Sequence, residues 1–522
     1  MDFLRNKNLI KLVGHFEKMG YQIRIVGGAV RDALQNLPCK DIDLCTDADP
    51  NEMMELAEKF SLNVIPTGLQ HGTVTFVING EPFEVTTLRI DVETDGRHAQ
   101  VEYTRDFELD AQRRDLTFNA MSMDMDGNIY DYFNGQDDLK RNRIRFVGNA
   151  ADRISEDYLR VLRWFRFASR GINFPSIPDF QHEYLLFKDY NTQAGLSKIS
   201  GERIWSELKK ILVAKHNADT IKTMIDTNVI SSVSTNHLSF RPATFSEFTR
   251  KVLRETNVIN GWGDEFADMK EAMVMAALAT VVGIENSDKV IERLKFSAKE
   301  RKYFEFMTRW LVLVQHPQIS YTQQNAGLNS WFYFQVAEGQ EPQLLMAALV
   351  VAEVFSHYTN SVLKNVMTVD GKVHYDYPMI PFPITGKDLM DAGVKPGPTM
   401  GHLLRAFRAD WSLPHRGTVG VEYCMGILKR FKDPSKIYSM KITKKSVEEF
   451  MSGFKTRSAD GLLDSNKAEH TVLDAMAANE PEFYFAEFEM QPYGDDHFLV
   501  FFKDKESAMV AKLQESIFAS AR

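Results

Sequence analysis

The sequence predicts an α+β protein in which a head with a mixed sheet precedes a largely helical remainder. Up to about residue 150, short runs rich in β-branched residues alternate with amphipathic stretches, which is the pattern of strands among helices. From Asp152 to about residue 435, one helical pattern follows another. The last part of the chain returns to alternating aromatic runs. These changes of pattern define the predicted architecture.

The head opens with two predicted helix and strand pairs. Residues 8–20 form an amphipathic pattern that ends at a glycine, and residues 21–26 form a β-rich run that breaks at two glycines. Residues 29–36 again show a helical pattern, and residues 41–45 form a second β-rich run. The head therefore begins with alternating helices and strands.

A β-hairpin is predicted over residues 73–90. Two β-rich runs, residues 73–78 and 83–90, flank the dipeptide Asn79-Gly80. Asn-Gly is the strongest short signal for a two-residue hairpin turn, because both positions need a positive φ. We therefore expect these runs to pair as antiparallel strands.

The C-terminal part of the chain predicts a small appended αβ unit. Residues 482–490 and 497–502 are aromatic, alternating runs joined by a Tyr-Gly-Asp-Asp turn, and residues 505–518 show a helical pattern. We assign no role to this unit, which spans residues 436–522.

Composition restricts the kinds of surface that the protein can present. The chain has 522 residues, with 44% hydrophobic and 25% charged residues, which is ordinary for globular domains. The net charge of −9 argues against a generally basic surface, so an RNA site has to be a local basic stripe. Three cysteines lack zinc-type spacing. No apolar run reaches 18 residues, so no membrane partner is expected.

The first chemical signal is the turn Gly27-Gly28, with Arg31 in the helix that follows. A strand that passes through glycines into a helix brings backbone N–H groups and the positive helix end close to a phosphate. The guanidinium of Arg31 can then hold a triphosphate oxygen. A tight strand-to-helix turn with a surface arginine is the plainer interpretation of these residues alone.

The second signal is the pair Asp41 and Asp43. Residues i and i+2 of a strand project from the same face, where two carboxylates repel each other unless a cation lies between them. Two Mg²⁺ ions would supply that cation and activate a 3′-hydroxyl. Glu84, in an otherwise apolar and threonine-rich strand, is the candidate third carboxylate. A solvated edge pair and a rim glutamate are the alternatives.

Two arginine-rich segments follow. The run Gln112 to Ala120 contains two adjacent arginines and an aspartate, which by themselves indicate a solvated helix start. The run from Ser155 to Phe167 places arginines at steps of three among apolar and aromatic residues. We interpret Ser155 as the N-cap of a helix, and the arginines form a slowly turning stripe along one face, which suits phosphates or a base edge as well as solvent.

Taken in order, these segments resemble the class II tRNA nucleotidyltransferase and bacterial-type poly(A) polymerase family. That family has a polymerase-β-like nucleotidyltransferase head with a mixed sheet, followed by an all-helical neck, body and tail, and the resemblance implies the same fold here. It is carried by residues 27–32 (GGAVRD), 41–43 (DID), 113–115 (RRD), 156–160 (EDYLR) and 201–208 (GERIWSEL).

The resemblance also implies a role for each matched residue. Asp41 and Asp43 would hold the metals and act in catalysis together with Glu84. The residues expected to bind the nucleotide are Gly27, Gly28, Arg31 and Arg114 on the head, and Asp157, Arg160, Arg163 and Arg166 on the neck. Of these, Asp157 and Arg160 would recognise the incoming base.

Two further segments favour CCA addition over poly(A) synthesis. Residues 89–99 resemble the flexible loop after the catalytic strand of CCA-adding members, and residues 383–398 resemble their tail domain. The predicted domains are a catalytic head (1–150), a helical neck (151–215), a helical body (216–365), a helical tail that binds tRNA (366–435) and the appended unit (436–522).

The resulting prediction is an enzyme that adds CCA to the 3′ end of tRNA from CTP and ATP, releases pyrophosphate and uses two Mg²⁺ ions. Its partners would be the acceptor arm and elbow of tRNA, in the cytoplasm with mitochondrial or nuclear pools. The alternatives are a poly(A) polymerase, a partial CC- or A-adding enzyme, or a non-catalytic RNA-binding module. A kinase is disfavoured, since G-x-x-x-x-G-K-[ST] is missing.

Overall fold

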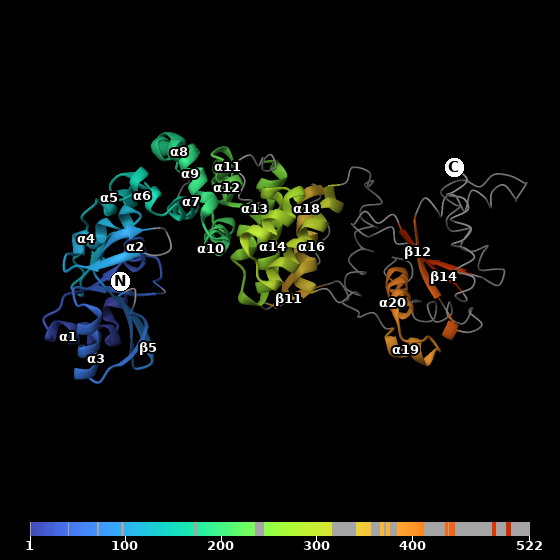
Figure 1. The fold of residues 1–522 in the computed structure, drawn as a ribbon, viewed down its shortest axis with the longest axis horizontal. Helices are drawn as coiled ribbons and strands as arrows, with labels where there is room; N and C mark the ends of the chain where they lie inside the picture. The colour runs from blue at the N-terminus through green and yellow to red at the C-terminus, as the bar shows by residue number, and fades with distance from the viewer. Residues whose placement is uncertain are drawn as a thin grey trace, which may run out of the picture. The chain divides into compact units, whose positions relative to one another are not determined.

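The computed structural model describes most of the N-terminal two thirds of the chain and separate segments beyond it (Figure 1). The described residues are 2–39, 41–69, 72–94, 99–171, 175–234, 245–315, 341–356, 366–369, 372–375, 384–411, 434–436, 438–443, 483–486 and 497–502. They fall into two compact units, of which the first comprises Met1–Trp262 and Val274–Lys302 and the second Gly263–Met273 and Tyr303–Arg522. No helix within the described segments is long and apolar enough to cross a membrane.

The first unit contains a seven-stranded mixed sheet with the order β3-β4-β5-β2-β1-β8-β9. Strands β2 and β5 run parallel, whereas the other neighbouring pairs are antiparallel. The strands are β1 (Ile23–Val26), β2 (Asp43–Thr46), β3 (Asn63–Gly68), β4 (Thr73–Ile78), β5 (Glu81–Thr87), β8 (Ser122–Met123) and β9 (Ile129–Tyr130). The predicted mixed sheet of the head is confirmed.

The predicted hairpin is formed by β4 and β5. Asn79 and Gly80 have φ values of 51° and 84°, as a tight hairpin turn requires. Every second residue of β4 is buried, so its apolar side chains meet the core while its threonines face the other side. The parallel pairing of β5 with β2 then places Glu84 directly beside Asp43.

Two helices, α1 (Lys7–Lys18) and α3 (Pro50–Lys59), pack against the sheet. Asn6 caps α1 by accepting from two backbone N–H groups, and Asp49 caps α3 in a reciprocal capping box. The buried stripe of α1 includes Phe16, whose ring meets that of Phe76 on β4 edge-on at 5.5 Å. These contacts form the core of the head.

Residues 89–99 depart from the predicted loop. Arg89–Thr94 forms β6 and Ala99–Tyr103 forms β7, and the two strands pair as an antiparallel ribbon apart from the main sheet. Residues 95–98 lie outside the described residues. The reason for the strands is local, because β-branched and aromatic residues alternate with polar ones in both residues 89–94 and residues 99–103.

Short helices complete the head, and longer helices follow it. In the head they are α2 (Gly28–Leu34), α4 (Phe107–Gln112) and α5 (Gly135–Lys140), with the 3₁₀ turn η3 (Thr117–Asn119). The following helices of the first unit are α6 (Ala150–Glu156), α7 (Leu159–Arg170), α8 (Gln181–Lys188), α9 (Tyr190–Lys198), α10 (Gly201–Leu212), α11 (Asn217–Asp226), α12 (Val229–Ser234), α13 (Glu247–Asn260) and α15 (Ser287–Leu294).

Helix α7 is held by an aromatic cluster and by α10. Trp164 is fully buried, and its ring contacts those of Phe165, Phe180 and Phe187 at centroid distances of 4.9–5.3 Å. The indole N–H of Trp164 donates to the carbonyl of Ile144, so this buried polar group is satisfied. The cluster therefore fixes the helix that carries the arginine stripe.

The N-terminus of α10 requires a glycine. A Cβ atom on Gly201 would lie 1.9 Å from the carbonyl oxygen of Arg293 at the end of α15. One turn further on, the Trp205 indole and the Lys209 ammonium both donate to Glu300 at 2.8 Å. This segment, which resembles the family's neck motif, therefore contacts two helices that follow it in the chain.

The second unit is helical at first and ends in strands. Helices α14 (Ala267–Val282) and α16 (Ala298–Gln315) contribute residues to both units, and the second unit also contains α18 (Pro342–Ser356), α19 (Gly386–Asp391) and α20 (Pro398–Trp411). The antiparallel pair β10 (Val366–Val369) and β11 (Lys372–Tyr375) corrects the expectation that the tail is all-helical, because β-branched residues dominate β10.

The predicted C-terminal strands are present, with a partner that sequence reasoning missed. Strand β14 (His497–Phe502) lies between β13 (Phe483–Ala486) and β12 (Tyr438–Thr443), and both pairings are antiparallel. The helix predicted over residues 505–518 lies outside the described residues. The limits of the five predicted domains stay predictions.

Candidate nucleotide-binding site

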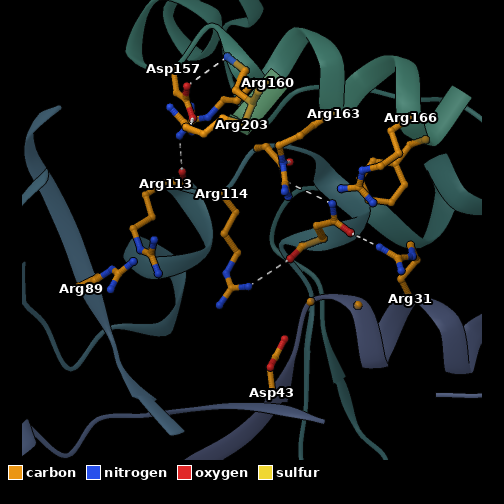
Figure 2. Close-up of a pocket in the computed structure, with 16 residues that line it drawn as sticks. Arg31, Asp43, Arg89, Arg113, Arg114, Asp157, Arg160, Arg163, Arg166 and Arg203 are labelled. Carbon is orange, nitrogen blue, oxygen red and sulfur yellow. Dashed lines mark hydrogen bonds and ion pairs between the residues drawn. The ribbon is translucent and has the colours of Figure 1, made fainter. Parts of the chain in front are cut away.

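A cavity of about 610 Å³ lies between the head and α7 within the first unit (Figure 2). This size is within the range of pockets that bind small molecules. The lining residues come from the glycine turn, α2, the strands β2 and β6, the segment around α4 and η3, the α6–α7 junction, and helices α7 and α10. They are Gly27, Gly28, Arg31, Asp43, Arg89, Arg113, Arg114, Asp115, Asn119, Asp157, Leu159, Arg160, Arg163, Arg166, Phe167 and Arg203.

The lining of the cavity is strongly basic although the chain as a whole is acidic. Eight arginines face three aspartates, so the lining carries a formal excess of five positive charges. A concave, partly desolvated site of positive charge attracts anionic ligands. The cavity is therefore built for a polyanion, and arginine is the side chain best shaped to bind phosphate oxygens in pairs.

The glycine turn brings the head's backbone to the cavity. Gly27 has a φ of 63°, a conformation that side chains with a Cβ rarely adopt. A Cβ on Gly27 would also lie 3.4 Å from an Nη atom of Arg114. Gly28 begins α2, and Arg31 one turn later donates to Asp32 and Asn119 at 2.8 Å. The turn thus places a helix start and one held arginine beside the same space.

Two arginines are fixed by a buried aspartate. Asp110 on α4 is 3% exposed and accepts from both Arg113 and Arg114, at 2.8 and 3.1 Å in the ion pairs. Burial by itself would raise the pKa of Asp110, but the charges of Arg114 and Arg113 outweigh it and hold the pKa below its ordinary value. Asp110 therefore stays ionised and orients both guanidinium groups toward the cavity.

Asp43 is the carboxylate that enters the cavity from the sheet. Figure 2 shows it pointing toward Arg114 from the end opposite to Asp157, Arg160 and Arg203. Burial, the charge of Glu84 and then the charge of Asp41 raise the pKa of Asp43, while Arg114 opposes the shift. A cation near Asp43 would relieve the repulsion among these three carboxylates.

Asp41 lies outside the strand, which corrects part of the sequence interpretation. Strand β2 begins at Asp43, so Asp41 occupies irregular backbone two residues earlier and does not line the cavity. The same-face argument for a strand therefore does not apply to it, although its charge reaches Asp43. Glu84 is exposed on β5 in register with Asp43, and no trio of His, Cys, Asp or Glu in the described residues has metal-site geometry.

The opposite end of the cavity is built on the α6–α7 junction. Ser155 belongs to the last turn of α6 and does not cap α7, contrary to the sequence interpretation. Asp157 takes the capping role, because its Oδ1 accepts from the backbone N–H of Leu159 at 3.1 Å. Its Oδ2 accepts from Arg203 at 2.7 Å. A carboxylate has about four acceptor positions, so capacity remains for a ligand.

Arg160 is held just as firmly. Its Nη1 donates to the carbonyl of Arg153 at 3.0 Å and to Glu156 at 2.6 Å, and its Nη2 donates to the carbonyl of Arg113 at 3.1 Å. A guanidinium has five N–H donors, of which these contacts use three. The remaining donors are available beside Asp157 at the cavity wall.

The other two neck arginines each pair with an acid. Arg163 donates to Asp115 at 2.5 Å, and Arg166 donates to Glu207 on α10. Burial lowers the pKa of Arg166, and the nearby charge of Glu207 opposes the shift. Only 9% of Arg166 is exposed, and its contact with Glu207 joins α7 to α10.

Comparison with known proteins places these features in a family. Residues 23–145 match the family described as Poly A polymerase head domain, and residues 191–233 match the one described as Probable RNA and SrmB-binding site of polymerase A. CCA tRNA nucleotidyltransferase 1, mitochondrial, of Mus musculus is 37% identical over 409 residues, which are 78% of this chain and 87% of the mouse protein. The chain belongs to the CCA-adding tRNA nucleotidyltransferase family.

Other relatives and solved structures agree. A CCA-adding enzyme of Bacillus cereus is 34% identical over 301 residues, 57% of this chain and 70% of that protein. The CCA-adding enzyme of Bacillus stearothermophilus in complex with CTP has the same fold, with a TM-score of 0.55 and 24% identity over 81% of this chain and 96% of that one. The Thermotoga maritima enzyme complexed with tRNA-CCA gives a TM-score of 0.53 with 20% identity, over 81% and 94% of the chains.

The cavity gathers most of the residues predicted for a CCA-adding tRNA nucleotidyltransferase. Nine of the predicted site residues line it, and Asp41 and Glu84 do not. Sequence reasoning did not assign seven further lining residues to the nucleotide site, namely Arg89, Arg113, Asp115, Asn119, Leu159, Phe167 and Arg203. All seven lie inside segments already singled out, but no local pattern distinguished the residues that face the cavity from their neighbours.

Proposed function

We propose that this chain adds CCA to the 3′ end of tRNA, and that the arginine-lined cavity binds the incoming CTP or ATP. The observation that carries the proposal is the joining of Gly27, Gly28, Arg31 and Asp43 of the head with the arginine stripe of α7 around one space. A nucleoside triphosphate carries about four negative charges and needs both phosphate ligands and a base-reading wall. The proposal is supported by the placement of Asp43 and Arg114 away from Asp157, Arg160 and Arg203 in the same cavity (Figure 2).

In this proposal the triphosphate lies at the glycine end. Arg31 and Arg114 are held by neighbouring side chains, so they can bind phosphate oxygens with little further ordering. The tRNA 3′-hydroxyl attacks the α-phosphorus, the bond to the β-phosphate breaks, and pyrophosphate leaves with its charge balanced by the arginines. The work of the protein is positioning and charge stabilisation.

The family's reaction is generally metal-dependent, and Asp43 and its acidic neighbours are the carboxylates nearest to the proposed triphosphate end. We propose that Asp43 and Asp41 hold Mg²⁺, two ions in all, with Glu84 as a further carboxylate. The support is the pairing of Asp43 with Glu84 in register, together with the raised pKa of Asp43, to which burial and then the charges of Glu84 and Asp41 contribute. Bound metal would lower the pKa of the attacking hydroxyl and neutralise the leaving pyrophosphate.

The base lies at the neck end, against Asp157 and Arg160. Cytosine and adenine each present an amino donor beside a ring-nitrogen acceptor, whereas uracil and guanine present the opposite order. The free acceptor positions of Asp157 and the free donors of Arg160 therefore match C and A and leave unpaired groups against U and G. The choice between C and A depends on the space left by the growing RNA end.

The test is extension of a tRNA transcript that lacks CCA, with CTP and ATP supplied singly and together. CTP alone should add two residues, ATP alone should add none, and both together should complete CCA. Repeated addition from ATP alone would indicate a poly(A) polymerase, and a product that stops at CC or needs a preformed CC would indicate a partial enzyme. No extension under any condition would indicate a non-catalytic RNA-binding module.

Compartment is a further proposal. The vertebrate relatives carry the word mitochondrial in their names, and we propose cytoplasmic function with a mitochondrial pool. Separate imaging of the full-length protein and of extension activity in purified mitochondria would test this, and activity confined to one fraction would exclude the shared distribution.

A further inference from the structure

One residue of the cavity, Asn119, links a polar contact of the head with a polar contact of α7. Asn119 closes the 3₁₀ turn η3 and is 7% exposed. Its Oδ1 accepts from Nη1 of Arg31 at 2.8 Å, and its Nδ2 donates to Oδ1 of Asp115 at 3.3 Å. The other carboxylate oxygen of Asp115 accepts from Nε of Arg163 at 2.5 Å. A continuous chain of polar contacts thus runs from α2 of the head to α7 through one amide.

The backbone of Asn119 adds a third contact. Its carbonyl oxygen accepts from Nη1 of Arg114 at 3.5 Å, and a Cβ on Gly27 would lie 3.8 Å from the same oxygen. Asn119 therefore touches the turn and two arginines that the proposed function assigns to the triphosphate. It reaches the neck arginine Arg163 through Asp115.

The 3₁₀ turn η3, which carries Asn119, is held in place by contacts with neighbouring helices. Thr117 donates its hydroxyl hydrogen to Asp138 at 2.7 Å, and Asp138 is fully buried. Gly135 lies so close that a Cβ there would be 2.4 Å from the carbonyl oxygen of Thr117. Phe118 meets Phe167 of α7 edge-on at 5.2 Å. Neighbours on both sides therefore restrain the backbone of Asn119, so its amide can act as a fixed reference for longer side chains.

A primary amide is suited to this position in a way that a carboxylate is not. It accepts at one atom and donates at the other, and here the acceptor faces a guanidinium while the donor faces a carboxylate. Arginine side chains have about 2 kcal/mol of rotamer entropy to lose. When a single rigid group holds two arginines, both side chains are already in position before the nucleotide binds.

We infer that Asn119 is a positioning residue, which sets the triphosphate arginine Arg31 of the head and the neck arginine Arg163 in one geometry, so that a nucleotide is bound by the head and the neck at once. This inference rests on the proposed function, because it presupposes that the cavity binds a nucleoside triphosphate. Asn119 itself acts through other side chains and transfers no proton.

The Asn119 side chain has two arms, the acceptor that faces Arg31 and the donor that faces Asp115, and substitution can separate them. Asn119→Ala removes both arms. Asn119→Asp is nearly isosteric and keeps an acceptor for Arg31, but it faces Asp115 with a second carboxylate and loses the donated hydrogen bond. Each arm involves a charged partner, for which the loss of one hydrogen bond lowers affinity by about ten- to a hundredfold.

The experiment measures binding of inorganic pyrophosphate and of CTP to the full chain, together with kcat/KM for CTP and the melting temperature. Asn119→Ala should weaken both ligands by about tenfold or more. Asn119→Asp should restore pyrophosphate affinity to about that of the unmodified protein while kcat/KM for CTP stays at least about tenfold low. This split is the result expected of a two-armed positioning residue.

A matched control is Asn128→Ala. Asn128 also donates through Nδ2 to an aspartate, Asp124, at 2.9 Å, but it lies on a head turn outside the cavity. Its loss should leave both ligands unaffected. If Asn119→Ala does not fold, Asn119→Asp carries the test alone through the same split.

Three results would overturn the inference. The first is an equal fall of pyrophosphate affinity and of kcat/KM for CTP in Asn119→Asp. The second is a lower melting temperature of Asn119→Ala and Asn119→Asp with unchanged affinities and kcat/KM. The third is the absence of any effect of either substitution. Failure of the proposed function would show differently, because the unmodified protein would then bind neither pyrophosphate nor CTP, or would bind them equally well after Arg31→Ala.

Discussion

Substitution of Asp157 tests the proposed recognition of the base, because the helix cap formed by this side chain can be separated from the hydrogen bonds that it would offer to a base. Oδ1 caps α7 through the backbone N–H of Leu159, and Oδ2 accepts from Arg203. Asparagine caps a helix about as well as aspartate, but its amide offers a donor in place of one acceptor. Asp157→Asn should therefore keep the cap and change the hydrogen bonds offered to the base, whereas Asp157→Ala should lose both.

The expected magnitudes follow from these contacts. Loss of the cap in Asp157→Ala should cost about 0.5–2 kcal/mol of stability. Loss of a matched pair of hydrogen bonds to a base is worth about 1–3 kcal/mol, so the preference for CTP over UTP should fall by about five- to 150-fold in both variants. Because Arg160 still presents donors, neither variant should use UTP as well as the unmodified protein uses CTP.

The assay is kcat/KM for CTP, ATP, UTP and GTP with the unmodified protein, both Asp157 variants and Arg160→Ala, accompanied by thermal unfolding. Asp189→Ala is the matched control, since Asp189 caps α9 by accepting from two backbone N–H groups and lies outside the cavity. It should lose stability as Asp157→Ala does, with unchanged nucleotide preference.

The reasoning would be refuted by nucleotide ratios that stay constant in Asp157→Asn, Asp157→Ala and Arg160→Ala. That result would leave Asp157 as a helix cap only and would move base selection elsewhere. Equal shifts in the Asp189 control would point to general loosening of the helices.

Three further predictions concern the metal, the C-terminal part and pH. Asp43→Ala or Asp41→Ala should abolish C and A addition alike in a folded protein, and near-normal extension in Mg²⁺ by either variant would exclude the metal assignment. Removal of residues 436–522 should leave extension of a purified transcript largely intact, and its loss in a folded truncation would make that segment part of the enzyme. Buried hydrogen bonds from Lys209 and Trp205 lower the pKa of Glu300 to about 2, against the effect of burial itself. The stability that Glu300 contributes is therefore fully present above pH 4.5, the ordinary pKa of a glutamate, and is lost as the pH falls toward 2. The loss of unfolding free energy caused by Glu300→Gln, measured in urea, should therefore shrink between pH 4.5 and pH 2. A loss that stays constant over this pH range would contradict the prediction.

The sequence alone determined the features that depend on neighbouring residues. The hairpin at Asn79-Gly80 was predictable because a two-residue turn needs positive φ at both positions, and the structure has it. The strand, glycine turn and helix around Gly27 followed from the same local chemistry. The order of short motifs along the chain also identified the family before any three-dimensional contact was known.

Strand and helix limits were less predictable. Asp41 was placed in a strand, but β2 begins two residues later, at Asp43, where pairing with β5 starts. Ser155 was expected to cap α7, but it lies inside α6 and Asp157 caps instead. In each case several residues had suitable chemistry, and the packing of neighbouring elements selected one of them.

Only the tertiary structure decided which charged residues share a space. The amide of Asn119 lies between Arg31 and Asp115, and Arg203 reaches Asp157 across 46 positions of the chain. Nothing local distinguishes such a contact from a solvated side chain, because an arginine on a helix face has the same pattern in both cases. Its partner is set by how α2, η3, α7 and α10 pack, which is a property of the whole buried core, and the reach and orientation of each polar group follow from that packing.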